Sequence, residues 1–184
     1  MKQLPLSRLE RQDHLVNPYE FSDWTERSPV LSLMKDFRVH QPHTVHPDAD
    51  AIEAARLMSM EGVTEKLVTD KDGELVGLLT RDELSEQRIL IAQTALDVRR
   101  HELTVSDLMR PREDIPVVDY EALQGALVVD LVNTLRETGE SHCLVLDRIE
   151  HQIRGLISVA DIASRLHQPL AVKPKISIAQ AVLS

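Results

Sequence analysis

Two places in the sequence pair a hydroxyl residue with a carboxylate three positions later, and both follow a glycine and two aliphatic residues. Thr80 is followed by Glu83, and Ser158 by Asp161. Each hydroxyl stands where a strand is predicted to pass into a helix, and a helix start suits a phosphate because its amide groups are unpaired and carry a partial positive charge. A nearby carboxylate can accept hydrogen bonds from hydroxyl groups. The same spacing also forms a capping box, which stabilises a helix start without any ligand, so both interpretations stay open.

Three histidines, His40, His43 and His46, are spaced three residues apart and precede Asp48. Imidazole groups at this density can bind zinc or nickel. Residues three apart on an extended strand face opposite sides, however, so we expect histidines of a solvated loop and no metal. Cys143 is the only cysteine, which excludes an intrachain disulfide, and its apolar surroundings predict a buried, unreactive thiol. No hydrolase, phosphate-loop or metalloprotease signature is present, so we expect no enzymatic activity.

The composition limits the partners that the protein can have. The 184 residues carry a net charge of −9, and the isoelectric point is about 5.3. Nucleic acids and anionic membranes repel an acidic surface, so we expect neither as the main partner. No apolar run is long enough to span a membrane, and residues 1–7 lack the apolar core of a signal peptide. These features predict a soluble cytoplasmic protein.

The elements that position the two hydroxyl–carboxylate pairs also occur twice, in the same order. Each copy predicts a short helix, a strand, a longer helix, two antiparallel strands and a second helix. In the first copy we predict them at residues 29–34, 43–45, 47–60, 66–70, 74–79 and 80–101. In the second copy we predict them at residues 105–109, 115–118, from 119 onward, 143–147, 153–157 and 158–166. We interpret this order as an internal duplication.

The second copy is longer than the first. Its extra residues lie around 133–141 and predict about two more turns of its first long helix. Its hairpin turn, residues 148–152, is also longer and has no glycine. In the first copy Asp72 and Gly73 predict a tight hairpin turn, because Asp-Gly accepts the positive backbone angle that such a turn needs.

The duplication divides the chain into an N-terminal arm (1–28), a first repeat with a linker helix (29–102), a second repeat (103–167) and a C-terminal tail (168–184). One repeat has too little core to be stable alone, so we expect the two to pack as one module about a pseudo-two-fold axis. The arm holds Tyr19, Phe21 and Trp24 in an otherwise polar sequence. We predict that these aromatic residues pack against their own domain or a second subunit; a partner-binding arm is the alternative.

The repeats resemble a tandem pair of cystathionine-β-synthase (CBS) domains, an arrangement called a Bateman module. The resemblance covers roughly residues 29–166 and depends on three repeated features. These are the entry helices at 30–34 and 105–109, the central strands at 67–70 and 144–147, and the two Gly-x-x-Thr/Ser turns. The resemblance implies a mixed α/β (α+β) fold in which two β-α-β-β-α repeats pack as one pseudo-two-fold module.

The resemblance also implies a regulatory protein rather than an enzyme. Modules of this kind bind adenosine-containing ligands, namely AMP, ADP, ATP or S-adenosylmethionine, in clefts between the repeats, and they form homodimers. Transferred to this sequence, the family pattern places Ser158 on the phosphate and Asp161 on the ribose hydroxyls of one ligand. In the other cleft it places Thr80 on the phosphate and Glu83 where the family has aspartate.

The resemblance further implies an adenine slot at the strand edges, formed by Ile115 and Val117 or by Thr44 and Val45. The acidic residues Asp82 and Asp114 would repel phosphate groups and favour neutral or cationic adenosyl ligands over ATP. We therefore expect a stand-alone regulatory module that binds an adenosyl ligand and signals to a partner protein. The alternative is a ligand-free scaffold of the same fold, which dimerises and docks a partner through the arm or the tail.

Overall fold

The computed structural model describes residues 8, 10–12, 15, 24–167 and 169–170. Its first half contains η2 (Val30–Leu33, a 3₁₀ helix), β1 (Lys35–Asp36), β2 (Thr44–Val45), α1 (Ala51–Glu61), β3 (Glu65–Thr69), β4 (Leu75–Thr80), α2 (Glu86–Leu96) and the 3₁₀ helix η3 (Arg100–Glu102). Its second half contains α3 (Val105–Leu108), β5 (Arg110–Pro111), η4 (Arg112–Asp114), β6 (Val117–Asp119), α4 (Tyr120–Leu123), α5 (Val128–Thr138), β7 (His142–Asp147), β8 (Gln152–Ser158) and α6 (Val159–Leu166). None of the helices in these described ranges is both long and apolar enough to cross a membrane.

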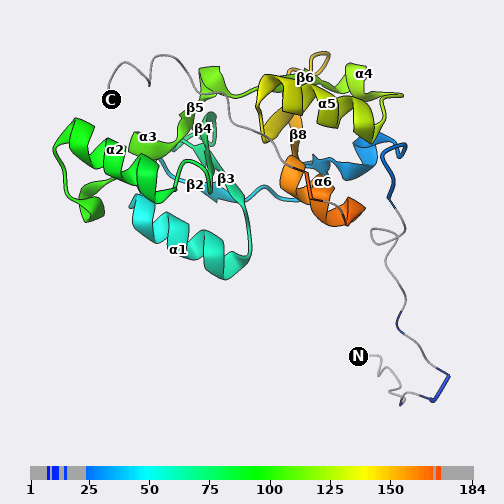
Figure 1. The fold of residues 1–184 in the computed structure, drawn as a ribbon, viewed down its shortest axis with the longest axis horizontal. Helices are drawn as coiled ribbons and strands as arrows, with labels where there is room; N and C mark the ends of the chain where they lie inside the picture. Colours follow the sequence, from blue (N-terminus) through cyan, green and yellow to red (C-terminus); the bar gives the residue numbers. More distant parts are fainter. Residues whose placement is uncertain (1–7, 9, 13–14, 16–23, 168, 171–184) are drawn as a thin grey trace, which may run out of the picture.

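Two four-stranded sheets form the framework, and each takes one strand from the other repeat. One sheet has the order β2-β3-β4-β5, and the other has the order β6-β7-β8-β1. In both sheets the first pair of strands is parallel and the other pairs are antiparallel. Figure 1 shows α1, α2 and α3 around one sheet and α4, α5 and α6 around the other. The predicted α/β module of two β-α-β-β-α repeats is confirmed.

The short helix that precedes each repeat is exchanged together with its strand. Val30 and Leu33 of η2 are buried in the hydrophobic core beneath α5 and α6, and Val105 and Leu108 of α3 are buried in the core beneath α1. The backbone N–H groups of Val30 and Val105 donate to carbonyls just before α5 and α1, at 3.0 and 2.8 Å. The segment that precedes the first repeat therefore completes the core of the second repeat, and the segment that precedes the second repeat completes the core of the first.

A third apolar cluster joins the two sheets in the middle of the molecule. It contains Leu67 and Leu78 from one sheet and Leu144 and Leu156 from the other. These four side chains are at most 8% exposed. The two halves therefore share an interior, as the small core of a single repeat predicts.

The helix predicted to begin at Thr80 begins later. Thr80 is the last residue of β4, and α2 follows Ser85, whose hydroxyl accepts a hydrogen bond from the backbone N–H of Arg88 at 3.4 Å. The prediction was wrong because Thr80 donates its hydrogen bonds to Glu83 within a buried turn and does not cap a helix. The predicted extension to residue 101 is interrupted at Asp97, which has a left-handed backbone (φ 54°).

The first long helices of the two copies have equal length, contrary to prediction. α1 and α5 each contain 11 residues, and α1 begins after its N-cap Asp50 rather than at residue 47. Both helices end at a glycine of positive φ, Gly62 (69°) and Gly139 (72°), at the same distance from the next strand. Because these glycines fix the helix ends, the extra residues of the second copy lie before α5, where they form α4 and the following loop.

The described end of the N-terminal arm packs against the second repeat. Trp24 contacts the hydrophobic core beneath α5 and α6. The guanidinium carbon of Arg165 lies over the Trp24 ring, 5.7 Å from the ring centroid. For Trp24 this agrees with the prediction that the arm packs on its own domain. Tyr19, Phe21 and the tail residues 171–184 lie outside the described residues.

Candidate functional site

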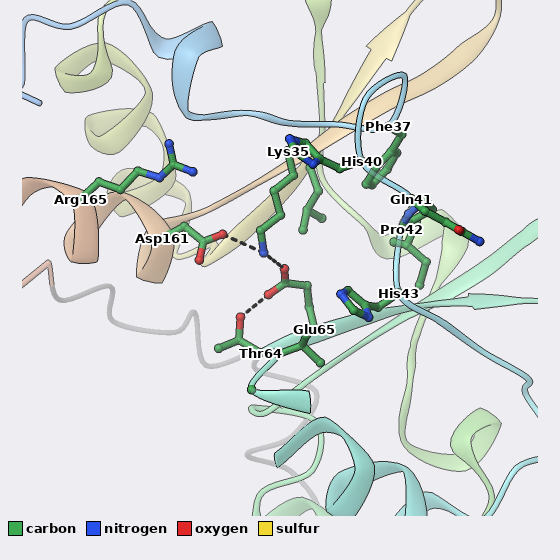
Figure 2. A pocket seen from close by; sticks show the side chains of 14 residues that line it. Lys35, Phe37, His40, Gln41, Pro42, His43, Thr64, Glu65, Asp161 and Arg165 are labelled. Atoms are coloured by element: carbon green, nitrogen blue, oxygen red, sulfur yellow. Dashed lines mark hydrogen bonds and ion pairs between the residues drawn. The ribbon is translucent and has the colours of Figure 1, made fainter. Parts of the chain in front are cut away.

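A cavity of about 340 Å³ lies between the two repeats, beside the start of α6. Its walls come from residues 40–43 before β2, residues 62–64 between α1 and β3, Glu65 at the start of β3, and Lys35 on β1, while α6 contributes Asp161 and Arg165. Figure 2 shows how these side chains surround the cavity. The exchange of β1 between the sheets brings these distant segments together.

Ser158 and Asp161 have different roles at the start of α6. Ser158 is 1% exposed, and its Oγ accepts a hydrogen bond from the backbone N–H of Asp161 at 3.0 Å, as predicted for an N-cap. The carboxylate of Asp161 lines the cavity and points toward Lys35 (Figure 2). Ser158 therefore fixes the helix start, and Asp161 presents the carboxylate that a ligand can reach.

Lys35 links the two repeats across the cavity, and sequence analysis did not identify it. Its Nζ lies 2.9 Å from Oδ2 of Asp161 and also pairs with the carboxylate of Glu65. Burial alone would lower the pKa of Lys35, but the two carboxylates outweigh burial and raise it above its usual value. One signal was available, since a basic residue follows the methionine of both entry helices, as Lys35 and as Arg110.

Glu65 is the buried end of this charge network. It is 6% exposed at the start of β3 and contacts the hydroxyl of Thr64 and the ammonium of Lys35. Nε2 of His142 lies 3.6 Å from its Oε2. Burial would raise the pKa of Glu65, but the His142, Lys35 and Thr64 side chains outweigh burial and lower the pKa to about 2. Glu65 is therefore ionised at neutral pH and holds Lys35 in the cavity.

The three histidines lie in two different environments. His40 and His43 line the cavity, whereas Nδ1 of His46 accepts a hydrogen bond from the backbone N–H of Asp48 at 3.3 Å. Nδ1 of His43 lies 3.8 Å from Oε2 of Glu61. Within the described part of the chain, no group of three His, Cys, Asp or Glu side chains could hold a metal ion.

The pair Thr80 and Glu83 is buried away from the cavity. The two residues are 4% and 3% exposed, and the Glu83 carboxylate accepts hydrogen bonds from the backbone N–H of Thr80, at 2.9 Å, and from its hydroxyl. Nε of Arg110 lies 3.9 Å from Oε1 of Glu83, and the same guanidinium donates to Glu140 at 2.5 Å. These groups satisfy one another, and neither Thr80 nor Glu83 lines a cavity described here.

The residues predicted to form the adenine slot lie in four different environments. Ile115 is buried in the central apolar cluster, and Val45 packs on the core beneath α1. Thr44 is exposed, although the loop before it lines the cavity beside Asp161. Val117 is half exposed and lines a second cavity of about 370 Å³ between β6 and α5.

The second cavity is mostly apolar, although Thr134, Thr138 and Glu140 also line it. Cys143 lines it, and burial together with the nearby Glu140 raises the pKa of the thiol to about 12. The thiol is therefore protonated at neutral pH, and its burial agrees with the prediction. At the matching position of β3 the first repeat has Lys66, whose Nζ pairs with Glu61 at 2.7 Å.

Comparisons with known proteins agree with this architecture. Residues 34–88 match the family model of the CBS domain. A search of curated proteins gave no match. Among solved structures, the conserved CBS domain protein TA0289 from Thermoplasma acidophilum is 21% identical, with a TM-score of 0.52, over 81% of this chain and 73% of that chain.

Two further solved structures contain adenosyl ligands. CBSX2 in complex with AMP is 22% identical, with a TM-score of 0.51, over 72% of this chain and 90% of that chain. The CBS domain pair of protein MJ0100, in complex with 5′-methylthioadenosine and S-adenosyl-L-methionine, is 18% identical, with a TM-score of 0.51, over 76% of this chain and 95% of that chain. At these identities the similarity shows the fold. The match of residues 34–88 shows that the first repeat is a CBS domain, and the solved structures show that the two repeats together have the fold of a CBS-domain pair.

Proposed function

We propose that this CBS-domain pair is a regulatory module, not an enzyme, that binds an adenosine-containing ligand beside Asp161 and signals to a partner protein. The observation that carries the proposal is the position of the Asp161 carboxylate, which points into a cavity between the repeats. The complexes of CBSX2 with AMP and of the MJ0100 pair with 5′-methylthioadenosine and S-adenosyl-L-methionine support the ligand class.

The residues around the cavity suit the parts of such a ligand. The carboxylate of Asp161 can accept hydrogen bonds from both ribose hydroxyls, and the ammonium of Lys35 can bind a phosphate. The loop of residues 40–43 and Val63 offer the walls of a slot for the base. Ser158, which the family pattern places on the phosphate, supports the ligand indirectly, because its hydroxyl already caps α6.

Ligand binding should raise the melting temperature of the native protein. A ligand at 100 times its Kd stabilises the folded state by about 2.7 kcal/mol, which corresponds to a shift of about 5–10 °C for a domain of this size. We expect AMP, ADP, ATP or S-adenosylmethionine to produce this shift, and Asp161→Asn to remove it. Differential scanning fluorimetry measures both effects.

The matched control for Asp161→Asn is Glu137→Gln, which changes an exposed carboxylate on α5 away from the cavity. This variant should keep the full ligand-induced shift. The proposal fails if no adenosyl ligand raises the melting temperature, or if Asp161→Asn responds like the native chain.

A ligand-free scaffold is the second candidate function, and two observations favour it. Lys35 already neutralises Asp161, and Thr80 and Glu83 already satisfy each other. In this case adenosyl ligands leave the melting temperature unchanged, and deletion of residues 1–23 abolishes association with the partner. Association that persists after this deletion would count against docking through the arm.

We also propose that the protein forms a homodimer through α1 and α2. These helices carry five large apolar side chains that are 37–70% exposed, namely Leu57, Met60, Leu90, Ile91 and Leu96. In α2 only Ile89 is buried, so this helix exposes more apolar surface than it buries. No large apolar side chain of α5 or α6 is exposed in this way. Exposed apolar side chains in this number favour an interaction surface, and a second copy presents the same two helices.

Ile91→Glu should convert the dimer to a monomer, because it places a charge in the proposed interface. Light scattering coupled to size-exclusion chromatography at tens of micromolar protein measures the mass. Ile149→Glu is the matched control, because Ile149 is 73% exposed in the turn between β7 and β8. A native chain that is monomeric, or an Ile91→Glu variant that stays dimeric, would overturn this interface.

A further inference from the structure

We propose that Lys35 is an internal competitor for Asp161, which makes the cavity selective for adenosyl ligands that carry an anionic group over neutral nucleosides. The inference rests on the proposed function, because it concerns the ligand class of the same cavity. The observation behind it is that the carboxylate which a ribose would use is already paired with a cation from another segment of the chain.

The position of Lys35 defines this competition. Its Nζ lies between the carboxylate of Glu65 on β3 and that of Asp161 on α6, and Figure 2 shows the ammonium inside the cavity. The side chains of Lys35 and Asp161 are 39% and 30% exposed, so both can exchange partners with a molecule that enters from solvent. Ribose hydroxyls that approach Asp161 from the cavity therefore meet the ammonium of Lys35.

The exchange has different consequences for neutral and anionic ligands. When a neutral nucleoside binds, its ribose hydroxyls replace Lys35 as the partner of Asp161, but the nucleoside gives the ammonium no new partner. The ammonium is then paired with Glu65 alone, and part of its charge is no longer compensated. When a nucleoside monophosphate binds, its ribose hydroxyls bind Asp161 and its phosphate binds Lys35. The new ion pair between the phosphate and Lys35 replaces the lost pair between Lys35 and Asp161. The ligand's phosphate thus compensates for the pair that its ribose displaces.

The charges of the cavity support this preference. Lys35 and Arg165 balance Glu65 and Asp161 among the described residues of the lining. Asp82, which the sequence predicts to repel phosphate, is not part of this lining and instead accepts a hydrogen bond from Ser141 at 3.4 Å. Asp114 does not line the cavity either. A phosphate that enters the cavity therefore meets Lys35, which is paired with Glu65 and Asp161, and Arg165, whose guanidinium lies over the Trp24 ring.

Isothermal titration calorimetry with AMP and with adenosine tests the inference. We expect native protein to bind AMP about tenfold more tightly than adenosine. In Lys35→Met, which keeps the aliphatic stem and removes the charge, adenosine should bind more tightly than to native protein and AMP more weakly. The ratio of the two affinities should then approach one.

Two further variants keep the result interpretable. Lys71→Met removes an exposed lysine in the turn between β3 and β4 and should leave both affinities unchanged. Lys35→Arg keeps the positive charge and should keep the preference for AMP. If circular dichroism shows that Lys35→Met is unfolded, Lys35→Arg becomes the informative variant.

The possible failures are distinguishable. If native protein binds adenosine as tightly as AMP, if Lys35→Met leaves the ratio unchanged, or if Lys35→Arg loses the preference, Lys35 is not the competitor, while the proposed function stands. If neither AMP nor adenosine binds native protein or the folded Lys35 variants, this inference falls, and the proposed function falls with it when ADP, ATP and S-adenosylmethionine also leave the melting temperature unchanged.

Discussion

Replacing Gly155 with alanine should lower the free energy of unfolding by about 3 kcal/mol, near the upper end for overpacking. Gly155 lies on β8 opposite Asp36 of the exchanged strand β1. A Cβ atom at this position would lie 2.6 Å from the carbonyl oxygen of Lys35 and 2.7 Å from Cγ of Met34. Because the nearest atom belongs to the backbone of the paired strand, the clash can be relieved only by moving β1 away from β8.

Gly77 is the matching glycine of the first copy and provides a graded comparison. A Cβ at Gly77 would meet Sδ of Met109 first and the carbonyl oxygen of Arg110 at 2.9 Å. A methionine side chain can move more readily than a backbone, so Gly77→Ala should cost about 1–2 kcal/mol. Urea denaturation followed by circular dichroism measures both variants.

Double variants separate side-chain from backbone clashes. Met109→Ala should rescue much of the loss caused by Gly77→Ala, relative to Met109→Ala alone. Met34→Ala should rescue less of the loss caused by Gly155→Ala, since the carbonyl of Lys35 remains in place. Equal rescue at both glycines, or native stability of Gly155→Ala, would contradict the close approach of the exchanged strands.

These glycines show what the sequence could and could not predict about the fold. Periodicity and turn residues predicted β3, β4, β7 and β8, and the hydroxyl of Ser158 predicted the start of α6. The exchange of η2 and β1 was not predictable, because an apolar pattern identifies the buried face of a segment but not the partner that buries it. The exchanged strand lies so close to the glycine of each repeated motif that a larger residue does not fit there. The need for glycine therefore becomes visible only in the folded chain.

The candidate site divides in the same way. Asp161 was predicted because its spacing from Ser158 is a local property of one turn. Lys35 and Glu65 were not predicted, because their meeting with Asp161 depends on the packing of three separate segments. Thr80 and Glu83 have the same spacing as the second pair, yet they are buried against each other. Local spacing therefore indicated where a site could lie, and tertiary packing determined which copy presents a carboxylate to a cavity.

Glu65→Gln should destabilise the protein by about 2 kcal/mol at pH 7. Removing one partner of a fully buried ion pair costs about 3–5 kcal/mol, and the cost is smaller here because Lys35 reaches solvent and keeps Asp161 as a partner. The difference between native protein and the variant should depend on pH in a defined direction. Urea denaturation between pH 7 and pH 2 measures it.

The sign follows from the pKa of Glu65, which is about 2 in the folded chain against an ordinary value of 4.5. A lowered folded-state pKa means that the carboxylate stabilises the native state fully above about pH 4.5 and loses this contribution as the pH falls toward 2. Native protein and Glu65→Gln should therefore converge in stability in acid. Glu74→Gln, an exposed change in the turn between β3 and β4, should show no such convergence. A difference for Glu65→Gln that stays constant from pH 7 to pH 2 would mean that Glu65 is not held ionised by Lys35, and the network that places Lys35 in the cavity would lose its buried anchor.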